Sequence, residues 1–401
     1  MRKDVLYYLW LQCVFGADNK AFKNGMSFFK TAEDFYNASE YDYKICDCFT
    51  SGTIKKLMNK DLSKARKILN DCEKLEYDII TYDDELFSDK LRAISAPPVL
   101  LYVKGTMPKV DKKFSVAMVG SRAATNQGLN AANAFAVSFA ESDAIVVSGG
   151  ALGIDTASHK GALNAYGLTI SVLGCGIDIG YPSRNIPMYE RIAKSGAVVS
   201  EFPPGYPPIG NNFPLRNRII CGLSDCTLVV QAGEKSGALI TANCAVKEGR
   251  KLFSVPGSIF FKENKGSNNL LRLGYSAAIE PNDILNWYDA NKNSLNYSSD
   301  IDYNEKAELI QAPVISEDNA EVTELFDFDE QKAENTERKV PTDVSEDSVK
   351  VFMAISDEPV TADYISAKTG IPIHTLLSAL TELEIFGYIE SVVGGKYISK
   401  G

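Results

Sequence analysis

Residues 114–150 read FSVAMVGSRAATNQGLNAANAFAVSFAESDAIVVSGG, and this stretch decides the fold. Residues 114–120 and 144–150 are short and mostly apolar, as buried strands are, whereas residues 129–142 have the periodicity of a helix. A strand, a helix and a second strand in this order indicate a parallel pair joined by a crossover. Each of the two strands also runs into a polar turn that contains glycine.

The same alternation of strand and helix continues to residue 288. Further strand-like stretches are LTISVLG (168–174), AVVSEF (197–202), CTLVVQA (226–232) and KLFSVPG (251–257), and helical patterns such as ALITANCAVKEG separate them. Near-continuous apolar strands between helices favour an α/β fold with a doubly wound, mostly parallel, Rossmann-like sheet. Ligands of such folds bind at the carboxyl ends of the strands. We therefore expect residues 79–288 to form one Rossmann-like binding domain.

Three other regions flank this domain. Residues 1–78 show helical periodicity broken by glycines, which predicts a small helical domain. Residues 289–345 are polar and hold about fifteen acidic and about five basic residues, which predicts a flexible acidic linker. Residues 346–401 read as three helices followed by two short strands, which predicts a winged helix.

The expected recognition helix of the winged helix carries His374, Glu382 and Glu384 but no lysine or arginine. Helices that enter the major groove normally bring basic residues for phosphate and guanine. The composition therefore favours contact with protein over contact with DNA, and both alternatives stay open. The acidic linker and the winged helix could together bind a basic partner or compete with DNA.

Bulk composition narrows the class of protein. The net charge is −10, and the acidic linker accounts for nearly all of it, so a DNA contact requires a local basic patch. The 8 cysteines are scattered without a CxxC pair and there are only 2 histidines, so we expect no metal site. Free thiols suit the cytoplasm, and no apolar stretch is long enough to span a membrane.

The first two strands end in turns that are typical of anion sites. Gly120, Ser121 and Arg122 follow one strand, and Arg122 could pair with a phosphate or stack on a base. The segment Ser148–Asp155 follows the next strand and contains three glycines before a helix, which suggests a cradle for an anion. Alternatively, these glycines only permit tight turns from strand to helix.

The later strands also end in loops with basic or aromatic residues. Tyr181 offers a stacking face or core packing, and Arg184 and Asn185 offer polar contacts. Arg216 and Arg218 stand at an expected helix start, where they oppose the helix dipole unless an anion or an acidic side chain meets them. The full candidate set for nucleic-acid binding is Gly120, Ser121, Arg122, Ser148, Gly149, Gly150, Gly153, Tyr181, Arg184, Asn185, Phe213, Arg216, Asn217, Arg218, Ser236, Gly237 and Lys265.

No recognisable catalytic motif accompanies these loops. The chain contains no GxxxxGK[ST] segment, which argues against a P-loop ATPase, and no convincing Ser-His-Asp set. His159 lies one turn into the helix after the glycine-rich segment, where it could have a structural role or contact a ligand. We therefore expect no enzymatic activity and no cofactor.

The ordered set MVGSRAATNQG, VVSGGALGIDTASHKGAL, LGCGIDIGYPSRN, SEFPPGYPP, NFPLRNRII, SGALITA and SVPG closely resembles the DprA/Smf family of DNA-processing proteins. The resemblance is strong over about residues 77–280. It implies an extended Rossmann fold with an N-terminal domain of the SAM or helix-hairpin-helix type and a C-terminal winged helix. It further implies a homodimer that binds single-stranded DNA and loads the RecA recombinase during natural transformation.

By motif match, Arg122 resembles the family's DNA-contacting arginine. The YPSRN segment resembles a second contact, although Ser183 stands where family members often carry lysine, and Arg184 could substitute. The alternative is an enzyme similar to LOG-type phosphoribohydrolases, which carry PGGxGTxxE. Residues 235–243 read KSGALITAN at the similar place and lack the acid that cleavage of a glycosidic bond needs.

Overall fold

The computed structural model describes residues 3–17, 20–295, 310, 312, 344–355, 360–386, 388–392 and 396–399. The chain divides into two compact units, Met1–Phe326 and Asp327–Gly401. Each unit is built around its own sheet, and the first unit holds the glycine-rich loops.

The first unit is built on a nine-stranded sheet. Its strands are β1 (Asp78–Thr81), β2 (Leu100–Gly105), β3 (Ser115–Gly120), β4 (Ile145–Ser148), β5 (Thr169–Leu173), β6 (Ala197–Ser200), β7 (Cys226–Gln231), β8 (Lys251–Ser254) and β9 (Ser276–Ala277). Their order is β1-β2-β6-β5-β4-β3-β7-β8-β9. The strands from β3 to β9 pair in parallel, and β2 runs antiparallel to β1 and β6. The predicted Rossmann-like, mostly parallel sheet is therefore confirmed.

The order of strands places the candidate loops at one point of the sheet. From β3 the chain moves to one side through β4, β5 and β6, and then returns to the other side of β3 with β7 and β8. The crevice of an open α/β sheet lies at such a reversal, outside the carboxyl ends of the strands. The turns after β3, β4 and β7 meet there.

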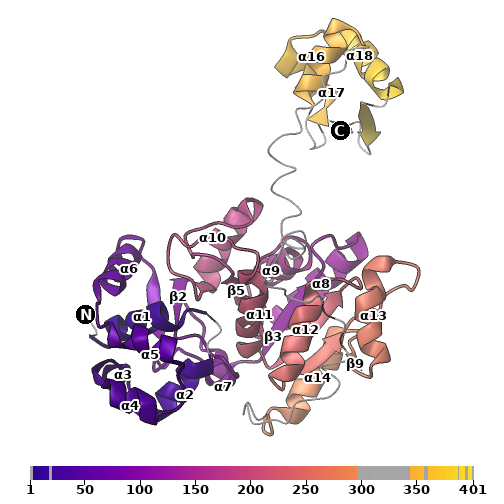
Figure 1. Ribbon diagram of the computed structural model, residues 1–401. Helices are drawn as coiled ribbons and strands as arrows, with labels where there is room; N and C mark the ends of the chain where they lie inside the picture. Colours follow the sequence, from indigo (N-terminus) through magenta and orange to yellow (C-terminus); the bar gives the residue numbers. More distant parts are fainter. Residues whose placement is uncertain are drawn as a thin grey trace. The chain divides into compact units, whose positions relative to one another are not determined.

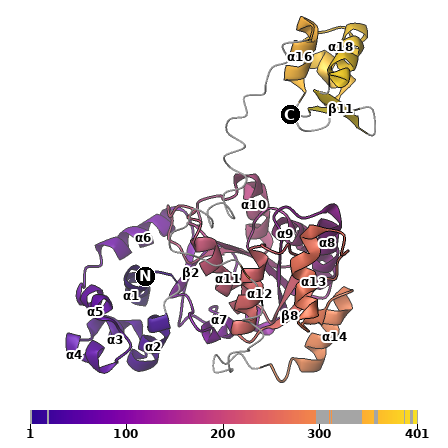
Figure 2. The same ribbon diagram turned by 45° about the vertical axis from the view of Figure 1, so that its right-hand side comes forward.

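Helices cover both faces of this sheet. They are α7 (Asp89–Ala93), α8 (Asn126–Glu141), α9 (Ile154–Asn164), α10 (Ile186–Ser195), α11 (Asn212–Gly222), α12 (Ala238–Lys247), α13 (Lys265–Arg272) and α14 (Pro281–Asn291). Alternate residues of β3 enter different cores: Val116 packs with α8, and Ala117 packs with α11 and α12. Both views show α13 and α14 at the sheet edge opposite to the N-terminal helices (Figures 1 and 2).

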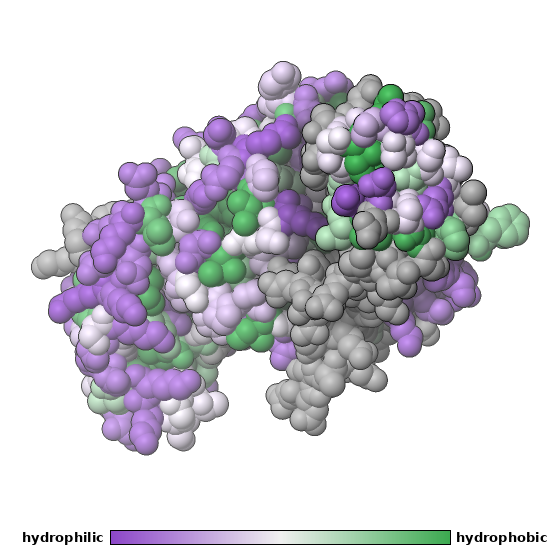
Figure 3. Space-filling model, turned by 90° about the horizontal axis from the view of Figure 1, so that it is seen from above, coloured by the Kyte–Doolittle hydropathy of each residue, from purple (hydrophilic) through white to green (hydrophobic). Residues whose placement is uncertain are grey.

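The described residues of the N-terminal region form six helices: α1 (Lys3–Phe15), α2 (Lys20–Phe29), α3 (Ala32–Asn37), α4 (Glu40–Ile45), α5 (Ser51–Met58) and α6 (Ser63–Lys74). Thr31, Ser39 and Thr50 cap three of them through side-chain oxygens. The buried side chains of α1 belong to the same hydrophobic cluster as Tyr102 of β2 and Val198 of β6. The outer surface at this end is mainly hydrophilic (Figure 3).

A lysine is enclosed by aromatic rings within this helical region. The Nζ atom of Lys60 lies 5.0 Å from the ring centroid of Trp10, 5.3 Å from that of Tyr36 and 4.9 Å from that of Tyr43. It also donates a hydrogen bond to the hydroxyl of Tyr43, at 2.6 Å. Burial lowers the pKa of Lys60 to about 8 from 10.5.

This lowered pKa predicts a pH dependence of stability. Between pH 8 and 10.5 the folded chain binds fewer protons at Lys60 than the unfolded chain, so the free energy of unfolding rises with pH across that window. Lys60→Met should flatten the rise, and Lys55→Met, at an exposed position, should leave it unchanged. Thermal unfolding of the three proteins from pH 7.5 to 10 measures the difference. Equal slopes for all three would rule out this role of Lys60.

The second unit is the predicted winged helix, which is confirmed. It consists of α16 (Glu346–Ala354), α17 (Ala362–Thr369), α18 (Ile373–Ile385) and the strands β10 (Val360–Thr361), β11 (Ile389–Val392) and β12 (Lys396–Ser399) in the order β10-β12-β11. Leu376, Leu380 and Leu383 of α18 are buried in its core. Of the two acidic side chains noted on this helix, Glu382 accepts hydrogen bonds from Ser345 and Ser348, and Glu384 accepts from Ser391.

Most of the acidic segment 289–345 lies outside the described residues. Helix α14 continues to Asn291, a few residues into the segment that we expected to be a linker. Its last turn is fixed by Tyr288, whose ring stacks on Phe114 at a centroid distance of 4.0 Å. Ile310 is also described, and it is buried in the core that lies under α11 and α12.

Candidate nucleic-acid interface

The turn after β3 is held by the end of β7. Gly120 has no room for a side chain, because a Cβ atom would lie 2.8 Å from the carbonyl oxygen of Gln231 and 2.4 Å from Ile154. The amide of Ser121 donates to the same carbonyl oxygen, at 2.7 Å. The side-chain oxygen of Gln231 accepts from the amide of Thr125, at 2.8 Å. Arg122 is thereby carried on a fixed, half-buried turn at the reversal of the sheet.

The turn after β4 is filled from within by its own carboxylate. Asp155 is buried, and its Oδ2 atom accepts from the amides of Gly149, at 3.1 Å, and Ala151, at 3.3 Å. Both amides belong to the segment Ser148–Asp155, which the sequence suggested as a cradle for an anion. Ser148, Gly149 and Gly150 are themselves buried, so the structure favours the alternative of a tight turn.

The two arginines of α11 are also buried. The helix begins at Asn212, so Arg216 and Arg218 lie beyond its first turn, and each is only 5% exposed. Arg218 donates from Nη2 to Glu201 at 2.6 Å, and from Nε to the carbonyl of Ala96 at 2.8 Å. This is the structural ion pair that the sequence left open as an alternative to DNA contact.

Arg216 supports the loops from below. Its Nη1 atom donates to the carbonyl oxygens of Gly149, at 2.7 Å, and Val172. Burial raises the pKa of Asp155, and the positive charges of Arg216 and Arg122 oppose that rise. Burial lowers the pKa of Arg216, and Asp155 opposes that change. Each charge therefore offsets part of the cost of burying the other. Arg216, through its bonds to Gly149 and Val172, fixes the spacing between the ends of β4 and β5.

Arg122, Phe213 and Tyr181 come together above this buried layer. The guanidinium carbon of Arg122 lies 5.8 Å from the ring centroid of Phe213, within the range of a cation–π contact. The rings of Phe213 and Tyr181 lie 5.3 Å apart at an angle of 37°. Phe213 is buried, whereas Arg122 and Tyr181 are half-buried and reach the surface. We call these three residues the Arg–aromatic cluster.

The last two residues of the YPSRN segment differ in burial. Arg184 is exposed. Asn185 is buried, and its amide donates to the carbonyl of Gly150 at 2.8 Å and to the hydroxyl of Thr156 at 2.9 Å. Asn185 thus holds the loop, while Arg184 stays available as a contact.

Two residues outside the candidate set help to build the site. Gln231 links the turns after β3 and β7. The hydroxyl of Tyr189 lies 2.8 Å from the carbonyl oxygens of both Gly150 and Tyr181 and can donate to either of them. Gln231 carried a signal in the sequence, because it is a polar residue at the end of an apolar strand. Tyr189 carried none, because it falls within an ordinary amphipathic helix.

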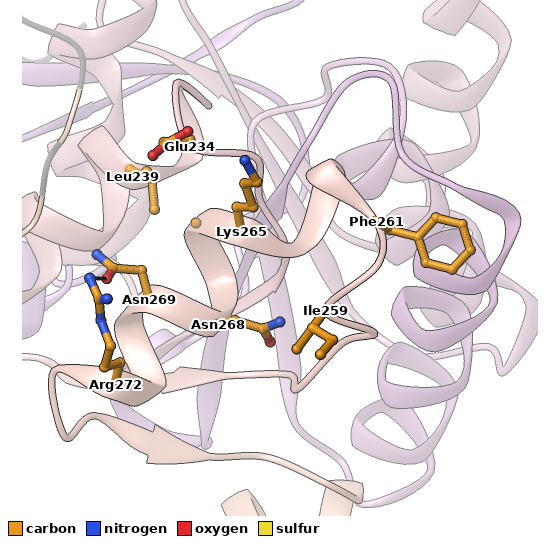
Figure 4. Close-up of a pocket in the computed structure, with 9 residues that line it drawn as sticks. Glu234, Leu239, Ile259, Phe261, Lys265, Asn268, Asn269 and Arg272 are labelled. Atoms are coloured by element: carbon orange, nitrogen blue, oxygen red, sulfur yellow. Dashed lines mark hydrogen bonds between the residues drawn. The ribbon is translucent and has the colours of Figure 1, made fainter.

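The remaining candidates lie farther along the same sheet edge. Ser236 and Gly237 precede α12 after β7, and they are half-buried. Lys265 begins α13 after β8, and it is exposed. Lys265 lines a separate pocket between α12 and α13 (Figure 4). Asn217, by contrast, is buried beside Arg216 and accepts from its Nε atom at 3.3 Å.

His159 has the structural role. It is fully buried, its Nδ1 atom lies 2.7 Å from the hydroxyl of Thr169, and burial lowers its pKa to about 3. The ring is therefore neutral and removed from the loops. Within the described parts of the chain, no group of three or more His, Cys, Asp or Glu side chains is arranged to hold a metal ion. No helix among the described residues is long and apolar enough to cross a membrane.

The chain combines a doubly wound sheet with a winged helix, and a cation and aromatic rings lie where the strand order of the sheet reverses. These features define a class of α/β proteins whose binding site lies at the carboxyl edge of the sheet. Comparison with known proteins identifies the member of this class. The chain belongs to the DNA recombination-mediator protein A family, whose family model matches residues 78–289. The model of the DprA winged helix domain matches residues 335–395. The resemblance to the DprA/Smf family is therefore confirmed.

Two relatives agree with this assignment, and a third structure shows a weaker likeness. The chain is 32% identical over 324 residues to Protein Smf of Escherichia coli, which covers 80% of this chain and 78% of that protein. The crystal structure of DprA from Streptococcus pneumoniae superposes with a TM-score of 0.62 and 31% identity, over 70% of this chain and 97% of that chain. DprA from Helicobacter pylori, studied for its binding of single-stranded DNA, gives a TM-score of 0.49 and 30% identity over 54% of this chain and 97% of that chain.

Proposed function

We propose that this DNA-processing protein binds single-stranded DNA through the Arg–aromatic cluster, without chemical turnover. The observation that supports it is the position of Arg122, 5.8 Å from the ring of Phe213 at the reversal of the sheet. A guanidinium can pair with a phosphate and also stack on a base, and an aromatic face accepts any base. Arg184 supplies a further exposed cation close to Tyr181 in the sequence.

The family extends this proposal to a cellular role. A mediator of recombination keeps single-stranded DNA in a form that a recombinase can use. We propose that the chain protects DNA that enters the cell during natural transformation and loads RecA onto it. It would act in the cytoplasm, as a homodimer, and without a cofactor.

Binding of a labelled oligo-dT, followed by fluorescence anisotropy over a salt series, tests the proposal. Wild type should bind with an affinity that falls steeply with salt, and Arg122→Ala should weaken binding about tenfold and reduce the salt slope by about one. Arg191→Ala, at an exposed position on α10, is the matched control and should bind as wild type does.

Three outcomes would argue against this function. If wild type does not bind the oligonucleotide, or if Arg122→Ala and Arg191→Ala bind equally, the Arg–aromatic cluster is not a DNA site. Release of a base from a nucleoside monophosphate would support the phosphoribohydrolase-type alternative instead.

A further inference from the structure

The loop between β8 and α13 exposes three large apolar residues in succession. Ile259 is 80% exposed, Phe260 is 90% exposed and Phe261 is 44% exposed. Single exposed apolar residues are common, but contiguous ones on a folded surface mark a binding site. In the view from above, apolar side chains project at the side on which α13 lies (Figure 3). We call residues 259–261 the apolar loop.

Hydrogen bonds hold this loop in place. The side chain of Asn268 accepts from the amide of Gly257 at 3.0 Å and donates to its carbonyl at 2.9 Å. Asn264 donates from its side chain to the carbonyl of Ser258, also at 3.0 Å. Side chains of α13 and of the turn before it thus fix the entry to the apolar loop. Because the loop is fixed in this way, the folded chain keeps the rings of Phe260 and Phe261 exposed to solvent.

A pocket of about 360 Å³ opens beside the apolar loop. Leu239 and Ile259 form apolar walls of the pocket. Its charged lining residues are two cations, Lys265 and Arg272, and one carboxylate, Glu234. Figure 4 shows the ring of Phe261 turned away from the other labelled side chains. A volume of this size suits a small ligand such as one nucleotide.

The pocket lies along the same sheet edge as the Arg–aromatic cluster. The side-chain amide of Gln231 donates to Asn264 at 2.7 Å and to the hydroxyl of Thr125 at 3.0 Å. One residue therefore ties the turn that carries Arg122 to the turn before α13. Strand β8 is two positions from β3 in the sheet, a distance of about 10 Å.

We propose that the apolar loop and the adjoining pocket bind further nucleotides of the same single strand that contacts Arg122. Bases would stack on Phe260 and Phe261, and phosphates would meet Lys262, Lys265 and Arg272. This inference rests on the proposed function and extends its contact surface along the sheet edge. Lys262 follows the rings in the sequence, and Lys265 and Arg272 line the adjoining pocket. These cations favour a nucleic acid over an apolar protein partner, because platforms for single strands combine aromatic faces with positive charge.

Oligonucleotides of two lengths test the proposal on the full chain. Phe260→Ser combined with Phe261→Ser should weaken binding of an oligo-dT of about twenty nucleotides about tenfold. The same variant should bind an oligo-dT of about six nucleotides as wild type does, because that length occupies the Arg–aromatic cluster alone. Phe28→Ser, at a phenylalanine 48% exposed on α2, is the matched control.

A fluorescent reporter gives a second readout that does not depend on loss of affinity. Phe260→Trp places an indole at a position 90% exposed, and a base stacked on it should quench its emission when the long oligonucleotide binds. Arg272→Gln should lower the salt slope for the long oligonucleotide by about one and leave that for the short one unchanged.

The possible failures are distinguishable. If Arg122→Ala weakens both lengths while the loop variants bind both as wild type does, the proposed function stands and this extension is wrong. If the loop variants instead change the sedimentation of the protein and leave DNA affinity unchanged, the apolar loop is a contact between copies of the chain. If wild type binds neither length, the proposed function itself fails.

Discussion

Lys90→Met should lower the free energy of unfolding by about 3–5 kcal/mol, because it leaves a buried carboxylate without its cation. Lys90 is only 3% exposed, and its Nζ atom donates to Asp225 at 2.7 Å and to the hydroxyl of Ser115 at 3.0 Å. It also donates to the carbonyl of Val110, at 3.2 Å. Burial lowers the pKa of Lys90, and the charge of Asp225 opposes this shift.

Denaturation followed by circular dichroism measures the loss. Lys112→Met, at an exposed position two residues after Val110, is the control and should change stability by less than about 0.5 kcal/mol. Combining Lys90→Met with Asp225→Asn removes both charges and should recover part of the loss. A single variant as stable as the control would show that the pair contributes nothing.

Gly153→Ala should reduce affinity for single-stranded DNA at least tenfold, because it forces apart the turns that carry the site. Gly153 has a φ of 78°, and a Cβ atom there would lie 2.3 Å from the carbonyl oxygen of Ser121 and 2.4 Å from that of Arg122. These are backbone atoms, so relief requires movement of the turn itself. The guanidinium of Arg122 would then leave the ring of Phe213.

A second glycine separates this effect from backbone strain. Gly205 also has a φ of 78°, but nothing lies within 4 Å of the position of its Cβ atom. Gly205→Ala should therefore lose about 1–2 kcal/mol of stability and keep its DNA affinity. Anisotropy and thermal unfolding of both variants give the comparison. Equal DNA affinities would show that contact between the turns does not position Arg122.

The strands and their turns could be predicted because their signals are local. Each of the six strands between residues 114 and 257 is a short, mostly apolar run that ends in, or is followed directly by, a glycine or a polar residue, and the sheet buries both of its faces. The winged helix followed in the same way from the periodicity of its helices. Strand β1 was not separated from its surroundings, because only its residues Ile79 and Ile80 are apolar and no glycine turn follows it.

The roles of the charged residues could not be predicted, because their partners are distant in sequence. Arg218 meets Glu201 and the carbonyl of Ala96, and Arg216 meets the carbonyl of Gly149. The sequence motif shows that the arginines stand near the start of a helix, but it does not show whether their side chains are buried or exposed. Arg122 precedes a helix in the same manner, yet it reaches the surface. The arginines differ in burial, and the burial of each one depends on how loops from different strands pack against it.

Helix α1 shares one hydrophobic cluster with a face of β2 and β6, so the helical region and the sheet do not form separate modules. A truncated chain that begins at β1 would expose Tyr102 and Val198 to water, so the sheet cannot be separated from the helical region as an independent domain. Their common core also fixes the helices relative to the carboxyl edge. Whatever docks on those helices is therefore held at a constant position with respect to the turn that carries Arg122.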